Sequence, residues 1–252
     1  MKSFAKCRYL LAWLLLFNAS PVQSDTVTVS TFDWCPYICP ESAAYPGLLV
    51  EYTRAIFERA GYEVAFIPYP WSRAIRHTAT GDADALLAPA RNETPDFIFP
   101  DTAIGAQRFC FFTRADDPWR YREPDSVAGR IILYPLDALP EVLAPHRDKA
   151  RFQGKAYGKD YLGQSVKMLE SGHIDTTLMT YYSMVYFLNG QGLSEHIGSA
   201  GCVSRQALYL AFSPAPEKAD RVAILIAAFE DAIGQLRKEG YFEKLLKKYQ
   251  LQ

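Results

Sequence analysis

Residues 68–87 read PYPWSRAIRHTATGDADALL, and this stretch decides the fold class. It follows an apolar run at 64–67, shows helical spacing over 72–80, and returns to an apolar run at 85–88. A strand, a helix and a second strand in this order predict parallel strands with the helix packed on the sheet. Trp71 stands between the first strand and the helix, so we expect it at the carboxyl edge of the sheet, where folds of this class bind ligands.

The same alternation continues on both sides of this stretch and predicts two similar halves. Besides an apolar run at 109–112, strands are expected at 26–29, 130–134, 151–157, 174–179 and 207–212, and helices at 49–60, 136–144, 161–171, 181–188, 222–236 and 242–249. The expected fold is therefore α/β, with each half a sheet covered by helices. The last two helices each carry an apolar stripe, which must dock on one of the halves.

The first 24 residues have the pattern of a cleavable secretory signal peptide. Three basic residues precede the apolar run Tyr9–Phe17, and Val22-Gln-Ser24 supplies a small residue before a cut at Asp25. The run is too short to anchor the chain in a bilayer, and no later segment approaches the roughly 20 apolar residues of a membrane span. We therefore expect a soluble mature chain in the periplasm.

Composition and charge exclude some classes of function. The chain has 252 residues, 49% hydrophobic and 22% charged, which is ordinary for a globular protein with one large or two small domains. Three of the 27 basic residues and none of the 28 acidic ones lie in the signal segment, so the mature chain has 24 against 28 and a formal charge of −4. Nothing in this balance indicates binding to a nucleic acid.

Four cysteines remain after the signal segment, namely Cys35, Cys39, Cys110 and Cys202. An even number in an exported chain favours disulfides, and four cysteines allow three pairings. Cys35 and Cys39 enclose only Pro-Tyr-Ile, so we expect a local bridge there and a second bridge from Cys110 to Cys202. Free buried thiols or a metal pair are the alternatives. The histidines are sparse and show no ligand spacing, so we expect no metal and no cofactor.

Several short motifs follow one another along the mature chain. They are Trp34-Cys-Pro-Tyr37, the first helix from Gly47 to Phe57, Pro70-Trp-Ser-Arg-Ala-Ile with Gly81-Asp-Ala-Asp-Ala-Leu, Leu169-Glu-Ser-Gly-His-Ile-Asp175, Tyr209-Leu-Ala-Phe-Ser213 and the closing helix Gly240–Tyr249. Each motif alone is weak, but their joint order resembles the extracellular solute-binding proteins of family 3. This family is best known for amino-acid receptors of ABC transporters.

The resemblance implies two lobes that are joined by two crossing strands and close on a ligand. Lobe 1 would comprise residues 25–103 and 213–252, with the terminal helices docked on it, and lobe 2 residues 104–212. Cys110 and Cys202 would then lie on the neighbouring crossing strands, which makes their pairing geometrically plausible. A monomer that captures a small polar solute and presents it to an ABC-type permease is the function implied.

Aromatic and basic side chains supply the candidate ligand contacts. Trp34, Tyr37 and Trp71 are the expected walls of the cleft, and the family's aromatic clamps fall at the two tryptophans. Ordinary core or rim packing is the alternative for all three. By the same resemblance Arg91 would hold a carboxylate, although it could equally be a solvated loop charge. Arg73, in the first turn of its helix, is a further candidate.

Lobe 2 departs from the amino-acid receptors of the family. Thr180, with Tyr181 beside it, stands where those receptors usually carry an acidic residue for the ligand ammonium. Asp137 stands where they offer a Gly-Ser/Thr turn for the carboxylate, which it would repel. Its alternative role is that of a helix N-cap. We retain these three residues as candidate contacts, but an L-amino acid held in the standard manner is not expected.

Two other classes of function stay open. An enzyme on the same scaffold would need an acid or base, for which Asp137, Glu41 and Lys159 are the candidates, but no spacing pairs them with a nucleophile or a metal. A sensory receptor would bind its solute in the same way and signal to a membrane partner. The aspartates Asp82, Asp84 and Asp175 are expected in structural turns.

Overall fold

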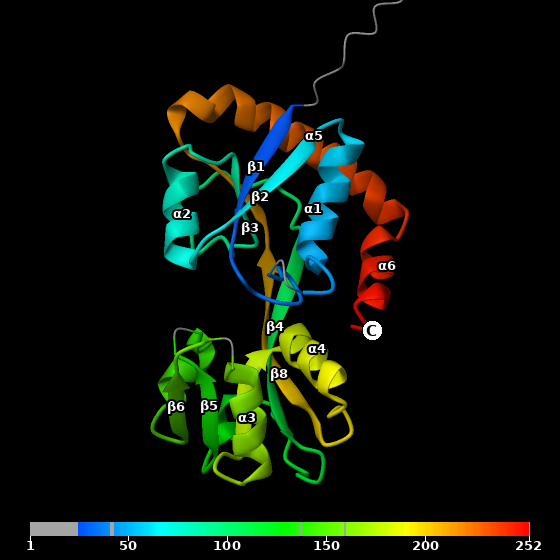
Figure 1. Ribbon diagram of the computed structural model, residues 1–252. Coiled ribbons are helices and arrows are strands. Elements are labelled where there is room, and N and C mark those ends of the chain that lie inside the picture. Colours follow the sequence, from blue (N-terminus) through cyan, green and yellow to red (C-terminus); the bar gives the residue numbers. More distant parts are fainter. Residues whose placement is uncertain (1–24, 41–42, 137, 159, 252) are drawn as a thin grey trace, which may run out of the picture.

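The computed structural model describes residues 25–40, 43–136, 138–158 and 160–251. The expected signal peptide and the candidates Glu41, Asp137 and Lys159 lie outside the described residues. Two mixed sheets, each flanked by helices, lie one above the other in Figure 1, which confirms the expected α/β fold. Within the described part of the chain, no helix combines the length and apolar character needed to cross a bilayer.

The first sheet has the strand order β2-β1-β3-β9. Its strands are β1 (Thr26–Thr31), β2 (Glu63–Pro68), β3 (Ala85–Leu87) and β9 (Leu210–Phe212). β1 pairs in parallel with β2 and β3, as the strand and helix alternation predicted, whereas β9 is antiparallel to β3. The candidate Trp71 therefore begins a helix at the carboxyl edge of this sheet.

Helices cover both faces of the first sheet (Figure 1). They are α1 (Leu48–Arg59), α2 (Trp71–Ala79), α5 (Ala219–Lys238) and α6 (Tyr241–Lys248), with a short 3₁₀ turn η3 (Pro216–Lys218) before α5. Successive side chains of a strand point to opposite faces, so Ala85 and Leu87 pack in the cluster of α1 and α5 while Leu86 packs in that of α2. The C-terminal helices dock on this half of the molecule, as expected: α5 packs on α1 and the sheet, and α6 packs on α1 and α5.

The second sheet has the strand order β6-β5-β7-β4-β8. Its strands are β4 (Gly105–Arg114), β5 (Ile131–Pro135), β6 (Arg151–Lys155), β7 (Thr176–Thr180) and β8 (Ile197–Leu208). The helices α3 (Tyr161–Glu170) and α4 (Tyr181–Gln191) and the 3₁₀ turns η1 (Pro124–Val127) and η2 (Glu141–His146) surround it. Phe112 packs in the cluster of α3 and α4, and Phe111 packs on the opposite face with Leu143 of η2.

Two segments differ from the sequence-based expectation. The helix expected at 136–144 is replaced by η2, because the residue before Pro140 is disfavoured in the helical region and Pro145 interrupts the turn. The last strand expected at 207–212 is divided at Tyr209 into the end of β8 and β9. Leu210–Phe212, assigned to lobe 2 from the sequence, therefore lies in the first sheet.

β4 and β8 connect the two sheets (Figure 1). They are the longest strands of the second sheet and pair antiparallel from Gly105 opposite Leu208 to Arg114 opposite Ile197. The register shifts twice along this ladder, once between Phe109 and Cys110. These are the crossing strands that the family resemblance predicts.

The structure contains both expected disulfides, Cys35–Cys39 and Cys110–Cys202. The first closes the loop after β1, and the second joins β4 to β8. Free thiols and a cysteine-bound metal are thereby excluded for these four residues.

In each sheet, an aspartate just before one parallel strand accepts a hydrogen bond from the backbone of the neighbouring parallel strand. Asp84 accepts the backbone N–H of Thr28 at 3.0 Å, and Asp175 accepts that of Ile131 at 2.7 Å. Asp84 is buried and also pairs with Arg221 at 2.9 Å, at the start of α5. The expected structural role of both aspartates is thus borne out by their contacts.

Candidate ligand-binding site

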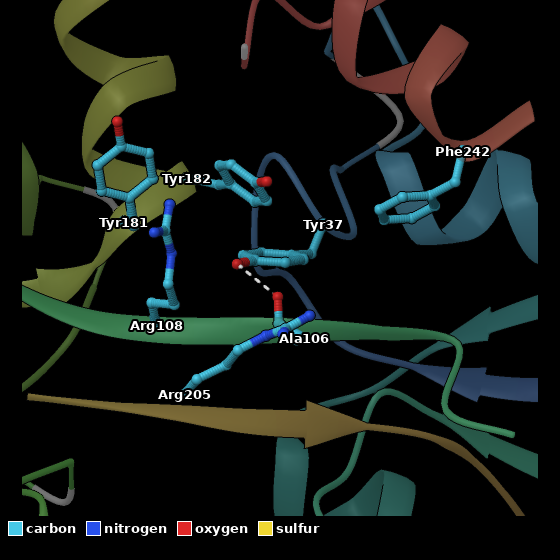
Figure 2. Close-up of a pocket in the computed structure, with 7 residues that line it drawn as sticks. All are labelled: Tyr37, Ala106, Arg108, Tyr181, Tyr182, Arg205 and Phe242. Carbon is cyan, nitrogen blue, oxygen red and sulfur yellow. Dashed lines mark hydrogen bonds between the residues drawn. The ribbon is translucent and has the colours of Figure 1, made fainter. Parts of the chain in front are cut away.

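A cavity of about 230 Å³ lies where the first sheet, the crossing strands and α4 meet. Figure 2 shows its lining, which comes from the loop after β1, from β4 and β8, from the start of α4 and from α6. The lining residues are Tyr37, Ala106, Arg108, Tyr181, Tyr182, Arg205 and Phe242. Elements that are far apart in the sequence therefore converge on one small space.

Aromatic rings supply much of the cavity wall. Tyr37 is buried, and its ring centroid lies 5.8 Å from that of Tyr182 on α4. The Tyr37 hydroxyl donates a long hydrogen bond of 3.4 Å to the carbonyl oxygen of Ala106 (Figure 2). Burial raises the pKa of Tyr37 well above its ordinary value. The hydroxyl therefore stays protonated at neutral pH and can donate a hydrogen bond.

Two arginines give the cavity its charge. Arg108 on β4 and Arg205 on β8 are directly opposite one another in the antiparallel ladder, and both are exposed. The Arg108 guanidinium lies 4.5 Å from the ring centroid of Tyr181. No carboxylate is among the described residues that line the cavity. The described lining thus combines two positive charges with four aromatic rings.

The candidate walls Trp34 and Trp71 belong to a group of contacting aromatic rings that includes the cavity residue Tyr37. The Trp34 ring stacks on Tyr37 with 4.2 Å between the centroids. Phe32 contacts both indoles, with its centroid 5.9 Å from Trp34 and 4.6 Å from Trp71. The sequence-predicted residues Trp34, Tyr37 and Trp71 therefore lie in one connected group, of which Tyr37 lines the cavity. A ligand held directly between the two indoles stays a prediction.

The candidate arginines Arg91 and Arg73 do not line this cavity. Arg91 donates to the carbonyl oxygen of Pro100 at 2.8 Å, and its guanidinium lies 4.4 Å from the ring centroid of Tyr209. The Arg73 guanidinium on α2 lies 4.5 Å from the ring centroid of Tyr69, which lies just before this helix in the sequence. Both guanidinium groups have partners inside the protein, and their roles as ligand contacts stay predictions.

The residues around Arg91 and the cavity lie on opposite faces of the ladder formed by the crossing strands. Adjacent side chains of a strand point to opposite faces, so Gln107 and Gln206 face away from the arginine pair. Their side chains hydrogen-bond to one another at 2.6 Å, and Gln206 also donates to Asn92 at 3.1 Å. The segment that contains Arg91 therefore contacts the opposite face of the ladder.

The candidates of the second sheet lie at the start of α4. Tyr181 lines the cavity, and its ring is the partner of Arg108. Thr180 directly precedes it and is buried, and its hydroxyl oxygen has no hydrogen-bond partner among the described residues. Asp137 lies outside the described residues, so its expected roles as a contact or an N-cap stay predictions. The described residues contain no cluster of three metal-ligating side chains.

A family model describing bacterial extracellular solute-binding proteins, family 3, matches residues 27–252. The chain belongs to this family. The match confirms the resemblance that the motif order indicated and covers both sheets, the crossing strands and the terminal helices. Among curated proteins, no sequence is detectably similar to this family 3 protein.

Solved structures share its fold. The probable amino-acid ABC transporter extracellular-binding protein ytmK from Bacillus subtilis is 18% identical with a TM-score of 0.72, over 91% of this chain and 99% of that chain. The L-cystine solute receptor of Neisseria gonorrhoeae, in an unliganded open conformation, is 18% identical with a TM-score of 0.67, over 90% and 93%. A histidine kinase sensor domain with similarity to periplasmic binding proteins is 21% identical with a TM-score of 0.64, over 90% and 96%.

Four cavity residues of this family 3 protein were not identified from its sequence, namely Arg108, Tyr182, Arg205 and Phe242. The two arginines lie in the crossing strands, of which only the apolar residues and the cysteines gave a prediction from the sequence. Tyr182 was expected only as part of the helix at 181–188, whereas α4 begins at Tyr181 and contributes both tyrosines to the lining of the cavity. Arg108 and Arg205 lie close in sequence to Cys110 and Cys202, which is a partial signal, but it does not give the register that places them opposite one another.

Proposed function

We propose that this family 3 protein is a monomeric periplasmic binding protein that captures a small polar solute, an amino acid or a related compound, and delivers it to an ABC-type permease. The two sheets with their helices act as two lobes, and β4 and β8 act as the hinge between them. The family match and the two disulfides, which fit an oxidising compartment, support this proposal.

The observation that carries the proposal is the composition of the cavity. Tyr37 comes from the loop after β1 and Phe242 from α6, Arg108 comes from a crossing strand, and Tyr182 comes from a helix of the second sheet. Ligand pockets combine apolar walls with a few fixed polar groups in this way. A solute bound there would contact both lobes at once and favour their closure.

Tryptophan fluorescence provides a test with an internal control. Trp34 stacks on the cavity residue Tyr37, whereas Trp119 packs on Phe111 in the second sheet. We expect a solute from a broad metabolite screen to raise the melting temperature and to quench tryptophan fluorescence. Trp34→Phe should remove most of the quenching, and Trp119→Phe should preserve it.

Two results would contradict the proposal. One is a screen in which no amino acid, organic acid, amine or sugar changes either the melting temperature or the fluorescence. The other is a bound solute whose quenching depends on Trp119 and is unaffected by Trp34→Phe, because the solute would then lie away from the cavity.

A sensory receptor is the second candidate function. The observation that favours it is the similarity of the fold to a histidine kinase sensor domain over 90% of this chain. The solute would bind in the same cavity, and the closed protein would act on a membrane receptor in place of a permease. Co-purification from solubilised membranes in the presence of the solute separates the two, because permease subunits support uptake and a receptor or kinase supports sensing.

A further inference from the structure

The arrangement of Arg108 and Arg205 is unfavourable in the protein alone. Residues directly opposite one another in an antiparallel pair lie about 5 Å apart at Cβ, and like charges in such a pair are destabilising. Within the described part of the chain, neither guanidinium has a carboxylate partner within ion-pair distance. The side chains of both line the same cavity. An anion placed between them would offset the repulsion.

We propose that the solute is a small organic carboxylate, held by the guanidinium groups of Arg108 and Arg205, with its apolar part against the tyrosines of the cavity. This inference rests on the proposed function and adds the chemical class of the solute. It also assigns the carboxylate to a position on the crossing strands, on the face of the ladder opposite to the segment of Arg91.

The shape of the donors favours a carboxylate. A guanidinium presents parallel N–H groups that match the two oxygens of a carboxylate, and such bonds are about twice as strong as neutral ones. The Tyr37 hydroxyl donates only a long hydrogen bond of 3.4 Å to Ala106, so it can donate to an oxygen of the solute instead. Tyr182 lines the same cavity as both arginines. Burial raises the pKa of its hydroxyl, and the positive charges of Arg108 and Arg205 oppose that rise.

The walls and the volume favour a small solute with a planar or apolar body. Tyr37, Tyr181, Tyr182 and Phe242 surround the arginines with rings that can stack on such a body. The volume of about 230 Å³ is below the roughly 300–1,000 Å³ of pockets for larger ligands. A carboxylate with one short or ring-shaped substituent fits both features.

Benzoate, its neutral isostere benzamide, and inorganic sulfate are suitable probes. In nuclear magnetic resonance spectra of the full mature chain, benzoate at millimolar concentration should shift the Nε–Hε signals of two arginines. Arg108→Gln and Arg205→Gln assign these signals, because each variant lacks one of them. Benzamide should shift neither. The proposal is overturned if benzamide acts as strongly as benzoate, if sulfate binds and benzoate does not, or if benzoate shifts only other arginines.

Affinity for the solute found in the metabolite screen gives the second readout. We expect Arg108→Gln and Arg205→Gln each to weaken binding by about 10- to 100-fold, with Arg108→Lys and Arg205→Lys retaining part of it. Arg122→Gln is the matched control, since Arg122 is exposed and does not line the cavity. Without solute, the Arg205→Gln variant should melt no lower than the wild type, because the repulsion is removed. Arg108→Gln removes the same repulsion but also the contact with the Tyr181 ring.

The outcomes separate this inference from the proposed function. A neutral or cationic solute that binds equally well to the wild type and to Arg108→Gln would overturn the carboxylate site and leave solute binding intact. Benzoate shifts at both arginines, in a protein that no metabolite stabilises, would support the anion site and count against the solute-capture function.

Discussion

At the scale of single residues, Tyr37 has both a packing role and a role in the candidate site. Its ring lies between Trp34, at 4.2 Å, and Tyr182, at 5.8 Å, while its hydroxyl reaches Ala106 on a crossing strand. The ring therefore links the loop after β1 to α4, and the residue also lines the cavity.

Substitutions of Tyr37 should separate these two roles. Tyr37→Ala removes a buried ring and should lower the free energy of unfolding by about 3–5 kcal/mol. Tyr37→Phe keeps the ring and loses one long hydrogen bond, so we expect a loss of about 1 kcal/mol or less. Urea unfolding of the two variants is the measurement. Equal losses would show that the hydroxyl, and not the ring, stabilises this junction.

Asp84 is the residue for which a dependence on pH is expected. Burial alone would raise its pKa, but hydrogen bonds from Arg221, Thr28 and Lys218 outweigh that effect and lower the pKa from 3.8 to about 2. A carboxylate whose pKa is lower in the folded state contributes about 2 kcal/mol to stability above about pH 5. This contribution should be lost as the pH falls from about 4 towards 2.

Asp84→Asn tests the assignment. At pH 7 it removes the carboxylate that pairs with Lys218 and, together with Asp25, with Arg221. This should cost about 3 kcal/mol, and the difference from the wild type should shrink towards pH 2. Asp82→Asn is the matched control, because Asp82 is exposed and accepts a hydrogen bond only from Thr80 among the described residues. An Asp84→Asn variant with the same acid dependence as the wild type would rule out Asp84 as the source.

At the scale of elements, the two disulfides should differ in their effect on stability. Cys110–Cys202 joins residues separated by 92 positions and Cys35–Cys39 residues separated by 4. From the loop-closure entropy, we expect that replacing Cys110 and Cys202 with serine lowers the free energy of unfolding by about 4–5 kcal/mol. Replacing Cys35 and Cys39 should lower it by about 2 kcal/mol. Denaturant unfolding of both double variants checks the order, and a larger cost for the short loop would contradict it.

The elements themselves were largely predictable from the sequence. Helical spacing of Leu49, Tyr52 and Ile56 predicted α1, and all three side chains are buried in the core cluster to which α5 also contributes. The full length of the crossing strands was not predictable. β8 contains several small residues and the exposed Ser204 and Arg205, so it has no continuous apolar face. Local patterns of hydrophobicity therefore predicted the core helices and strands, but only the apolar part of the crossing strands.

The arginine pair shows why the site was harder to predict than the fold. With Cys110 opposite Cys202, a regular antiparallel register would place Arg108 opposite Ser204. The register shift between Phe109 and Cys110 moves Arg205 into that place. A bulge depends on long-range pairing rather than on local sequence, so knowledge of the disulfide would not have been sufficient.

At the scale of the whole molecule, a helix of the second half contacts the C-terminal end of the chain outside the cavity. Asn189 on α4 donates to the backbone carbonyl of Gln250 at 3.0 Å, and the rings of Tyr186 and Tyr249 lie 6.4 Å apart. These contacts join α4 to the C-terminal end of the chain on one side of the crossing strands, so we expect closure to be a rotation about this side.

Small-angle X-ray scattering tests the expected closure. Saturating solute should lower the radius of gyration of the mature chain, because the lobes approach one another. An unchanged radius of gyration, together with binding measured by calorimetry, would show that solute binds to a rigid frame and that β4 and β8 do not act as a hinge.

The most direct measurement is a crystal structure of the protein with the solute that the screen identifies or that survives purification. The expected result is density in the cavity in contact with Tyr37, Tyr182 and at least one of the two arginines. Solute density elsewhere, or a cavity filled by the protein's own side chains in the solute-bound state, would contradict it.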